Sequence, residues 1–203
     1  HELYTRADAH VNGRATVPVL WDKETRTIVS NESADILRML NTGFGALAKG
    51  PDLYPADLAA DIDALNDAIY PTLNNGVYRA GFATTQLAYE EAFHDVFATL
   101  DALETRLSDG RQWLHGDRFT ETDIRALATL VRFDAAYHGL FKCNLRRIAD
   151  YPHLTAYTTR VHRLPGNAET VSIDHIKRGY YSIKALNPNG IVPLGPKLDW
   201  IVP

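Results

Sequence analysis

The sequence predicts a small α/β segment followed by an all-α domain. Two short β-branched runs joined by a charged turn, residues 17–21 and 27–29, predict a β-hairpin. Beyond residue 56, apolar residues recur every three or four positions, which is the period of amphipathic helices. Glycines and prolines are concentrated between the two patterns. We expect an α/β segment over 1–45, a linker over 46–55, a helical domain over 56–186 and an extended tail over 187–203.

The composition narrows the classes of partner. The 203 residues can bury the core of one domain or of two small ones. The net charge of -4 predicts no binding to nucleic acid or to an anionic membrane surface. No apolar run approaches the length of a membrane span. The single cysteine, Cys143, excludes an internal disulfide and fits a reducing compartment, so we expect a cytoplasmic protein.

The hairpin is flanked by residues that suit a peptide ligand. Pro18 has no amide donor, so it should lie at a strand edge, and the Val17–Pro18 bond is a candidate for the cis isomer. Such a turn leaves the N–H and C=O of Val17 free for a ligand. Ser33 should open a helix, which would end near Gly43, and a helix N-terminus attracts a carboxylate. A plain helix start explains residues 31–33 equally well, because Asn and Ser are favourable N-caps.

Periodicity and breaker residues place the later helices. A proline at position 71 should end or kink the first of them. Asp109-Gly110 should end the second. The third should begin at Thr120 as the N-cap, with Asp123 as the N3 member of a capping box. The expected helices cover residues 56–70, 84–107, 120–133, 151–164 and 168–181.

Blocks spread over nearly the whole chain resemble one family, the glutathionyl-hydroquinone reductases, which form the Xi class of glutathione transferases. The blocks are residues 16–22, 30–34, 74–82, 129–134 and 141–144, followed by Pro165-Gly166, Asp174-His175-Ile176, Tyr180 and Asn187-Pro188-x-Gly190-Ile191. The resemblance implies a partial thioredoxin-like domain, made of a β-hairpin and a helix, before a helical domain of the glutathione-transferase type. It also implies a homodimer formed through the helical domain.

The resemblance implies glutathione-dependent reduction of glutathionyl-hydroquinones. In the family, the cysteine of a Cys-Pro-Trp-Ala motif attacks the glutathionyl sulfur, and a second glutathione resolves the mixed disulfide. The 203 residues contain neither this motif nor the strand–helix unit that normally carries it. We therefore expect the chain to be part of a longer protein and to lack thiol-dependent activity alone. Cys143 lies in the helical domain and is expected to be a buried structural thiol.

The resemblance also assigns a glutathione site to the hairpin. The backbone of Val17, ahead of a cis Pro18, would pair with the cysteinyl part of glutathione. Glu32 and Ser33 would hold its γ-glutamyl group. Arg14 flanks this region and is a further candidate for the glutathione carboxylates, although an ordinary surface charge explains it as well.

Two tyrosines match the family's aromatic-substrate site. Tyr78 corresponds to a tyrosine that faces the active-site cysteine, and Tyr180 to a second one near the end of the last helix. A phenol can donate to a developing phenolate oxygen and lie against a quinol ring. Tyr181 competes with Tyr180 for the second role, since Gly179 stands where the family usually has histidine.

Other functions remain open at this point. The histidines show no ligand spacing and no His-Glu-x-x-His, so no metal is expected. A general glutathione transferase or thioltransferase is one alternative, and a non-catalytic module for glutathione or aromatic ligands is another. The residue in the missing motif separates them, because cysteine implies redox exchange and serine or tyrosine implies conjugation.

Overall fold

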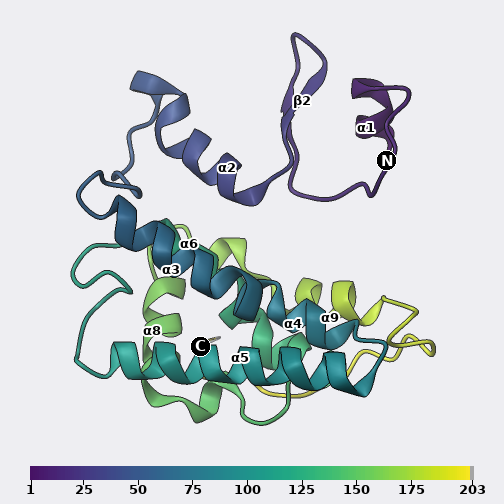
Figure 1. The fold of residues 1–203 in the computed structure, drawn as a ribbon, viewed down its shortest axis with the longest axis vertical. Helices are drawn as coiled ribbons and strands as arrows, with labels where there is room; N and C mark the ends of the chain where they lie inside the picture. The colour runs from purple at the N-terminus through teal and green to yellow at the C-terminus, as the bar shows by residue number, and fades with distance from the viewer. Residues whose placement is uncertain (202–203) are drawn as a thin grey trace. The chain divides into compact units, whose positions relative to one another are not determined.

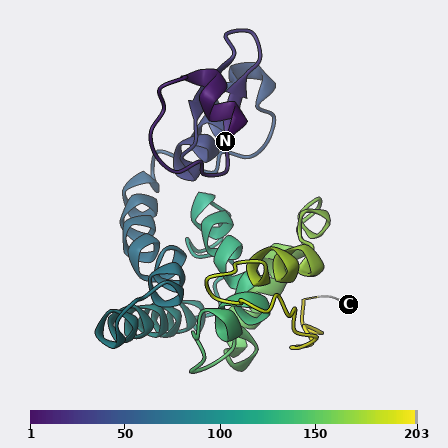
Figure 2. The same cartoon turned by 90° about the vertical axis from the view of Figure 1, so that its right-hand side faces the viewer.

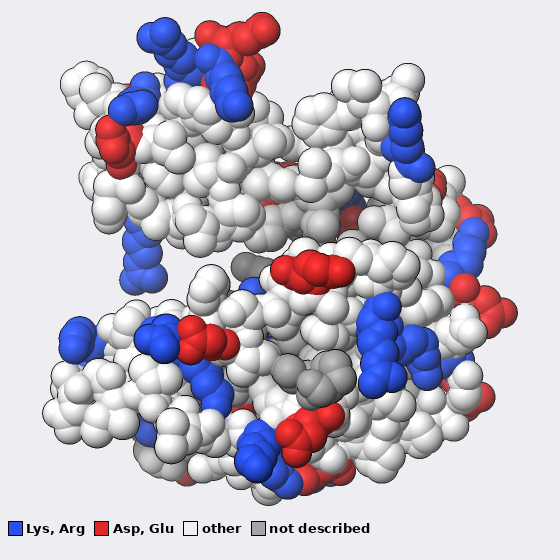
Figure 3. Space-filling view, turned by 180° about the vertical axis from the view of Figure 1, so that it is seen from behind, with Lys and Arg blue, Asp and Glu red and all other residues white. Residues whose placement is uncertain are grey.

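The computed structural model describes residues 1–201, which form two compact units, one of residues 1–55 and one from residue 56 onward (Figure 1). In this part of the chain, no helix combines the length and the apolar character needed to cross a membrane. Basic and acidic side chains both occur on the face shown in Figure 3, in keeping with the small net charge of -4.

The first unit contains the expected hairpin. Helix α1 (Glu2–Ala7) precedes strand β1 (Leu20–Asp22), which pairs antiparallel with β2 (Thr27–Ser30). The first strand begins three residues later than its β-branched run, so Val17 and Pro18 lie outside the ladder. The peptide bond between them is cis, as the sequence suggested. The side chain of Asp22 shapes the turn by accepting the N–H of Glu24 at 2.8 Å.

Helix α2 (Ser33–Arg38) begins at the predicted serine. A π-helical turn, Met39–Gly43, completes it, so the expected end at Gly43 is confirmed. A 3-10 turn, Gly45–Leu47, follows. Not one of residues 1–55 is fully buried, because two short strands and two short helices are too small to close a core among themselves.

The second unit is helical and holds the buried core (Figures 1 and 2). Its helices are α3 (Ala59–Ile69), α4 (Gly76–Gly81), α5 (Gln86–Leu107), α6 (Glu121–Arg132), α7 (His138–Leu140), α8 (Pro152–His162) and α9 (Ile173–Tyr181). Between them lie π-helical turns at Tyr70–Asn74 and Phe133–Tyr137, and 3-10 turns at Ile148–Asp150 and Ala168–Thr170. Helix α5 packs on α4 and α8, and α6 packs on α3 and α8.

The predicted recurrence of apolar residues every three or four positions is confirmed over most of α5. Ala92, Val96, Leu100, Leu103 and Leu107 are all buried, whereas Ala88, which continues the same period, is exposed near the start of the helix. Burying such a stripe against neighbouring helices supplies most of the stability of an amphipathic helix.

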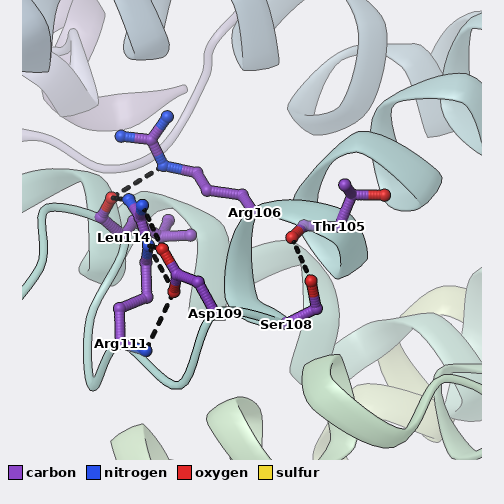
Figure 4. Close-up of polar contacts among 6 residues, drawn as sticks. All are labelled: Thr105, Arg106, Ser108, Asp109, Arg111 and Leu114. Carbon is purple, nitrogen blue, oxygen red and sulfur yellow. Dashed lines mark hydrogen bonds and ion pairs between the residues drawn. The ribbon is translucent and has the colours of Figure 1, made fainter.

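Helix α5 ends as predicted, just before Asp109-Gly110 (Figure 4). The hydroxyl of Ser108 donates to the carbonyl of Thr105 at 2.8 Å, which closes the last turn. The carboxylate of Asp109 forms an ion pair with Arg111 at 2.6 Å, and the hydrogen bonds from Arg111 lower the pKa of Asp109 to about 2. Gly110 then adopts a φ of 87°, in the left-handed region that favours glycine.

The capping box of α6 is also confirmed. The carboxylate of Asp123 accepts the N–H of Thr120 at 2.8 Å, the N–H of Leu114 at 3.0 Å and the hydroxyl of Tyr157 at 2.7 Å. The carboxylate is fully buried, and burial raises the pKa of Asp123 while these donors oppose the rise. The box therefore ties α6 to α8 as well as starting α6.

Two helix boundaries show what the periodicity could and could not resolve. Helix α3 ends at Ile69, one residue before the expected end, and Pro71 lies in the first turn of the π-helical segment that follows, where a missing N–H is tolerated. The last helix begins later than predicted. Residues 168–170 form a separate 3-10 turn, and α9 starts after Ser172, whose hydroxyl accepts the N–H of His175 at 3.3 Å.

The C-terminal tail is irregular over residues 187–201, as expected; Val202 and Pro203 lie outside the described residues. The tail is nevertheless attached to the helical unit. The ammonium group of Lys177, on α9, donates to the carbonyls of Leu194 and Gly195 at 2.9 and 3.0 Å. The side chains of Leu198 and Ile201 belong to the buried core.

Candidate functional site

In the first unit, Val17 presents an unused peptide edge. Its side chain is 88% exposed, and its N–H and C=O are hydrogen-bonded to no residue in the described part of the chain. The cis bond to Pro18 follows it. An extended peptide could therefore pair with the backbone of Val17.

A hydrogen-bond network that sequence reasoning missed holds this edge beside the start of α2. The hydroxyl of Tyr4 donates to the carbonyl of Thr16 at 2.8 Å, and the amide of Asn31 donates to the hydroxyls of Tyr4 and Thr16 at 3.1 and 3.0 Å. The hydrogen bond with the Thr16 side chain is the main cause that lowers the pKa of Tyr4. Tyr4 thus links the residue before Val17 to the residue before Glu32.

Glu32 and Ser33 lie at the opening of α2. Glu32 is the N-cap residue, its N–H donates to the hydroxyl of Ser30 at 3.1 Å, and its side chain makes no capping hydrogen bond. Both Glu32 and Ser33 are exposed. Arg14 is exposed as well and forms no ion pair with a described residue. The first unit therefore has an unused peptide edge, an exposed carboxylate and an exposed hydroxyl.

In the second unit, three tyrosine hydroxyls converge. The hydroxyl of Tyr180 lies 2.5 Å from that of Tyr78 and 2.8 Å from that of Tyr137, and the hydroxyls of Tyr78 and Tyr137 are 3.5 Å apart. They come from α4, the π-helical turn Phe133–Tyr137 and α9. The structure thus brings together the two tyrosines named from the sequence and adds a third.

Tyr137 was missed because nothing in its local sequence marks it. It is only 2% exposed and closes a π-helical turn, which shifts the residues after α6 away from the α-helical register. Burial raises the pKa of Tyr137 strongly, and the neighbouring tyrosines add to the effect. Burial also raises the pKa of Tyr180. Tyr137 and Tyr180 therefore stay protonated at neutral pH and can act as hydrogen-bond donors.

A buried phenylalanine supports the tyrosine cluster. The ring of Phe141 stacks on Tyr137 with centroids 5.2 Å apart, and it meets Tyr78 and Tyr180 edge-on at 5.4 and 5.7 Å. Gly81 makes room for it, since a Cβ at that position would lie 2.3 Å from the ring. Phe141 therefore fixes the rings whose hydroxyls form the cluster.

Tyr181 takes no part in the cluster. Its hydroxyl lies over α7, where a Cβ on Gly139 would come within 2.8 Å of it. Burial raises the pKa of Tyr181, and its hydroxyl bonds to none of the three clustered hydroxyls. Of the two neighbouring tyrosines, only Tyr180 shares a site with Tyr78.

Tyr78 and Tyr180 line a cleft of about 670 Å³, within the range usual for ligand pockets. One face of α6 forms an apolar wall, and α9 and the segment before it form the other side. The lining residues are Tyr78, Ile124, Leu127, Ala128, Val131, Arg132, Asn167, Thr170, Val171, Ser172, His175, Ile176, Gly179, Tyr180 and Ile183. Such a cleft suits an aromatic ligand that carries polar groups.

Cys143 is unsuited to nucleophilic chemistry. Its side chain is fully buried, and its thiol makes only a weak contact with the carbonyl of Phe141 at 3.9 Å. Burial raises the pKa of Cys143 to about 12, whereas a reactive cysteine has a lowered pKa. No group of three or more potential metal ligands was found among residues 1–201.

Two family descriptions match the chain. Residues 4–42 match "Glutathione S-transferase, N-terminal domain", and residues 86–160 match "Glutathione S-transferase, C-terminal domain". The glutathionyl-hydroquinone reductase PcpF of Sphingobium chlorophenolicum is 54% identical over 97% of the chain and 63% of its own length. The chain thus spans less than two thirds of this relative.

Solved structures give the same result. The glutathione-bound structure of YqjG from Escherichia coli superposes with a TM-score of 0.95 at 52% identity, covering the whole chain and 66% of that protein. The glutathione transferase Xi 1 of Trametes versicolor superposes with a TM-score of 0.94 at 45% identity, covering the whole chain and 71% of that protein. These similarities confirm the resemblance seen in the sequence blocks and the expected fold class.

Proposed function

The chain belongs to the Xi class of glutathione transferases, and we propose that it carries the glutathione-binding and hydroquinone-binding residues of a glutathionyl-hydroquinone reductase. The tyrosine cluster is the observation that carries the proposal. Three phenolic hydroxyls within 3.5 Å of one another at an apolar cleft are suited to an aromatic substrate whose oxygen gains negative charge.

The proposed reaction is an exchange at sulfur. A cysteine thiolate outside these 203 residues attacks the sulfur of the glutathionyl-hydroquinone, so that an S–S bond forms and the bond from sulfur to the ring breaks. A proton from solvent first adds to the ring carbon that bears the sulfur, which gives a ketone tautomer. The electron pair released when the sulfur–carbon bond breaks then restores the aromatic ring and passes to the oxygen as a phenolate, which a second proton converts to the free hydroquinone. A second glutathione then cleaves the mixed disulfide, which yields glutathione disulfide.

Each unit supplies one part of this chemistry. In the first, Val17 pairs with the backbone of glutathione, and Glu32 and Ser33 hold its γ-glutamyl group. In the second, Tyr78 and Tyr180 donate to the phenolate oxygen as charge develops. Tyr137 is a positioning residue, because its buried hydroxyl bonds Tyr180 at 2.8 Å and directs that group.

The experiment uses the natural gene product that contains these residues. With a glutathionyl-hydroquinone and excess glutathione, we expect release of the free hydroquinone and one glutathione disulfide per turnover. Replacing by serine the nucleophilic cysteine that the proposed reaction requires should abolish release. Conjugation of glutathione to electrophiles without any reduction would favour a general transferase instead. Binding of both ligands with neither reaction would favour a non-catalytic module.

The proposal extends to assembly and location. We propose a homodimer formed through the helical unit, as the family resemblance implies, and light scattering of the purified protein tests it. We also propose a cytoplasmic location, since the reaction consumes reduced glutathione and Cys143 is a free thiol. Fractionation of cells that express the natural protein would check the location.

A further inference from the structure

The charge balance of the cleft is one-sided. Among residues 1–201, its lining contains one permanently cationic residue, Arg132, together with His175, and no aspartate or glutamate. The remaining polar lining groups are uncharged hydroxyls and one amide, from Thr170, Ser172 and Asn167. Three acidic residues, Asp123, Glu169 and Asp174, adjoin lining residues in the sequence but do not line the cleft, and Asp174 is paired with Arg178 at 2.7 Å. The cleft therefore presents positive charge without a matching negative group.

Arg132 is anchored by one hydrogen bond and keeps further N–H donors for a ligand. It is the last residue of α6, it is half-buried, and one of its terminal nitrogens donates to the carbonyl of Ala128 in the preceding turn. No carboxylate among the described residues forms an ion pair with it. A guanidinium group has five N–H donors in a planar fork, so most of the donors of Arg132 remain for a ligand.

Arg132 also acts electrostatically on the tyrosine cluster. Burial raises the pKa of Tyr180, and the positive charge of Arg132, which lines the same cleft, opposes this rise. Ile124, Leu127, Ala128 and Val131 continue the same face of α6 as an apolar wall. An apolar wall that ends in an arginine without an ion-pair partner suits an aromatic ring that carries an anionic substituent.

We propose that the cleft selects hydroquinones that carry a carboxylate substituent, and that Arg132 is the residue that recognises this group. The inference rests on the proposed function only in assigning the hydroquinone to the cleft. A carboxylate accepts two parallel hydrogen bonds from a guanidinium group, which favours it over a neutral substituent of the same shape. The volume of about 670 Å³ leaves space for such an arm beside one aromatic ring.

The test measures equilibrium binding, so it needs neither glutathione nor a nucleophile. The 203-residue chain is titrated by calorimetry with a hydroquinone that bears an acetate arm and, separately, with the methyl ester of the same compound. We expect the acid to bind about tenfold more tightly than the ester, which corresponds to about 1.4 kcal/mol. Raising the salt concentration should reduce this ratio, because the cleft is open to solvent.

Variants identify the residue responsible. Arg132→Gln should bring the ratio of the two affinities close to one, and Arg132→Lys, which keeps the charge but loses the fork, should give an intermediate ratio. Arg178→Gln is the matched control, because it removes the same charge from an exposed pair outside the cleft, and it should keep the wild-type ratio. Thermal melting of each variant checks that it is folded.

Two results would overturn the proposal. One is a wild-type chain that binds acid and ester equally, which requires no variant to fold. The other is an unchanged ratio in folded Arg132→Gln, which would mean that Arg132 serves a group common to both ligands, such as the phenolic oxygen. Absence of hydroquinone release in the enzyme assay would contradict the proposed function but would leave the measured ratio, and so this inference, intact.

Discussion

Replacing Gly81 by alanine should destabilise the helical unit, although alanine is the better helix former. The new Cβ would lie 2.3, 2.5 and 2.8 Å from three atoms of the Phe141 ring. The ring cannot turn aside easily, because it is fully buried and stacked on Tyr137. Overpacking of this kind costs about 1–3 kcal/mol, and the gain in helix propensity is at most about 1 kcal/mol. We expect a net loss of about 1–2 kcal/mol.

Urea unfolding of the chain, followed by far-UV circular dichroism, measures this loss. Gly179→Ala is the matched control, because Gly179 lies inside α9 and a Cβ there would meet nothing within 4 Å. That variant should be as stable as the wild type or up to about 1 kcal/mol more stable. A Gly81→Ala chain that gains stability like the control would refute the packing argument.

A double-mutant cycle tests the partner in this contact. Phe141→Leu alone should be destabilising, since it leaves a cavity beneath the tyrosines. In the Gly81→Ala background the smaller leucine side chain also relieves the clash. The stability lost by the double variant should therefore be smaller than the sum of the two single losses by about 1 kcal/mol or more. Additive losses would mean that the Cβ at position 81 acts on something other than the Phe141 ring.

Further predictions concern three other residues. Iodoacetamide at pH 8 should leave Cys143 unmodified in the native chain and alkylate it in urea; rapid native alkylation would contradict its burial. Burial raises the pKa of Cys143 to about 12 from the usual 9.0. The stability that the buried neutral thiol contributes is therefore fully present below about pH 9 and is lost as the pH rises toward 12. Urea unfolding measured at a series of alkaline pH values can follow this loss. Lys177→Met should destabilise the unit by about 1–3 kcal/mol and speed proteolysis of the tail, since it removes the donor to the carbonyls of Leu194 and Gly195; unchanged cleavage would rule out this tether. Glu32→Gln should weaken glutathione binding about tenfold or more in calorimetry, and an unchanged affinity would remove Glu32 from the site.

Local signals predicted much of the fold. The capping box at Thr120 and Asp123 and the buried stripe of α5 depend on residues three or four positions apart, so the sequence displays them directly. The start of α9 was misplaced although its signal was present. Ser172 is a favourable N-cap, but a run of helix-compatible residues before it hid the break.

The missed site residues depend on contacts that no local pattern encodes. Tyr4, Thr16 and Asn31 meet across as many as 27 positions, so their network follows only from the folded hairpin. Tyr137 joins the cluster because a π-helical turn aims its side chain, and π-helical turns lack a recognisable sequence signature here. The family resemblance named Tyr78 and Tyr180 as candidates, whereas finding the third hydroxyl beside them required the structure.

The central claim is that Tyr180 donates to the oxygen of the departing hydroquinone. The direct measurement is single-turnover release of hydroquinone from its glutathionyl adduct by the natural gene product, with Tyr180→Phe compared against Tyr181→Phe. Loss of one donor to a developing oxyanion typically slows a reaction by about 10²–10³-fold, so we expect such a loss for Tyr180→Phe. Tyr181 lies over α7 and outside the cluster, so its variant should match the wild type. Equal rates for all three proteins would contradict the claim.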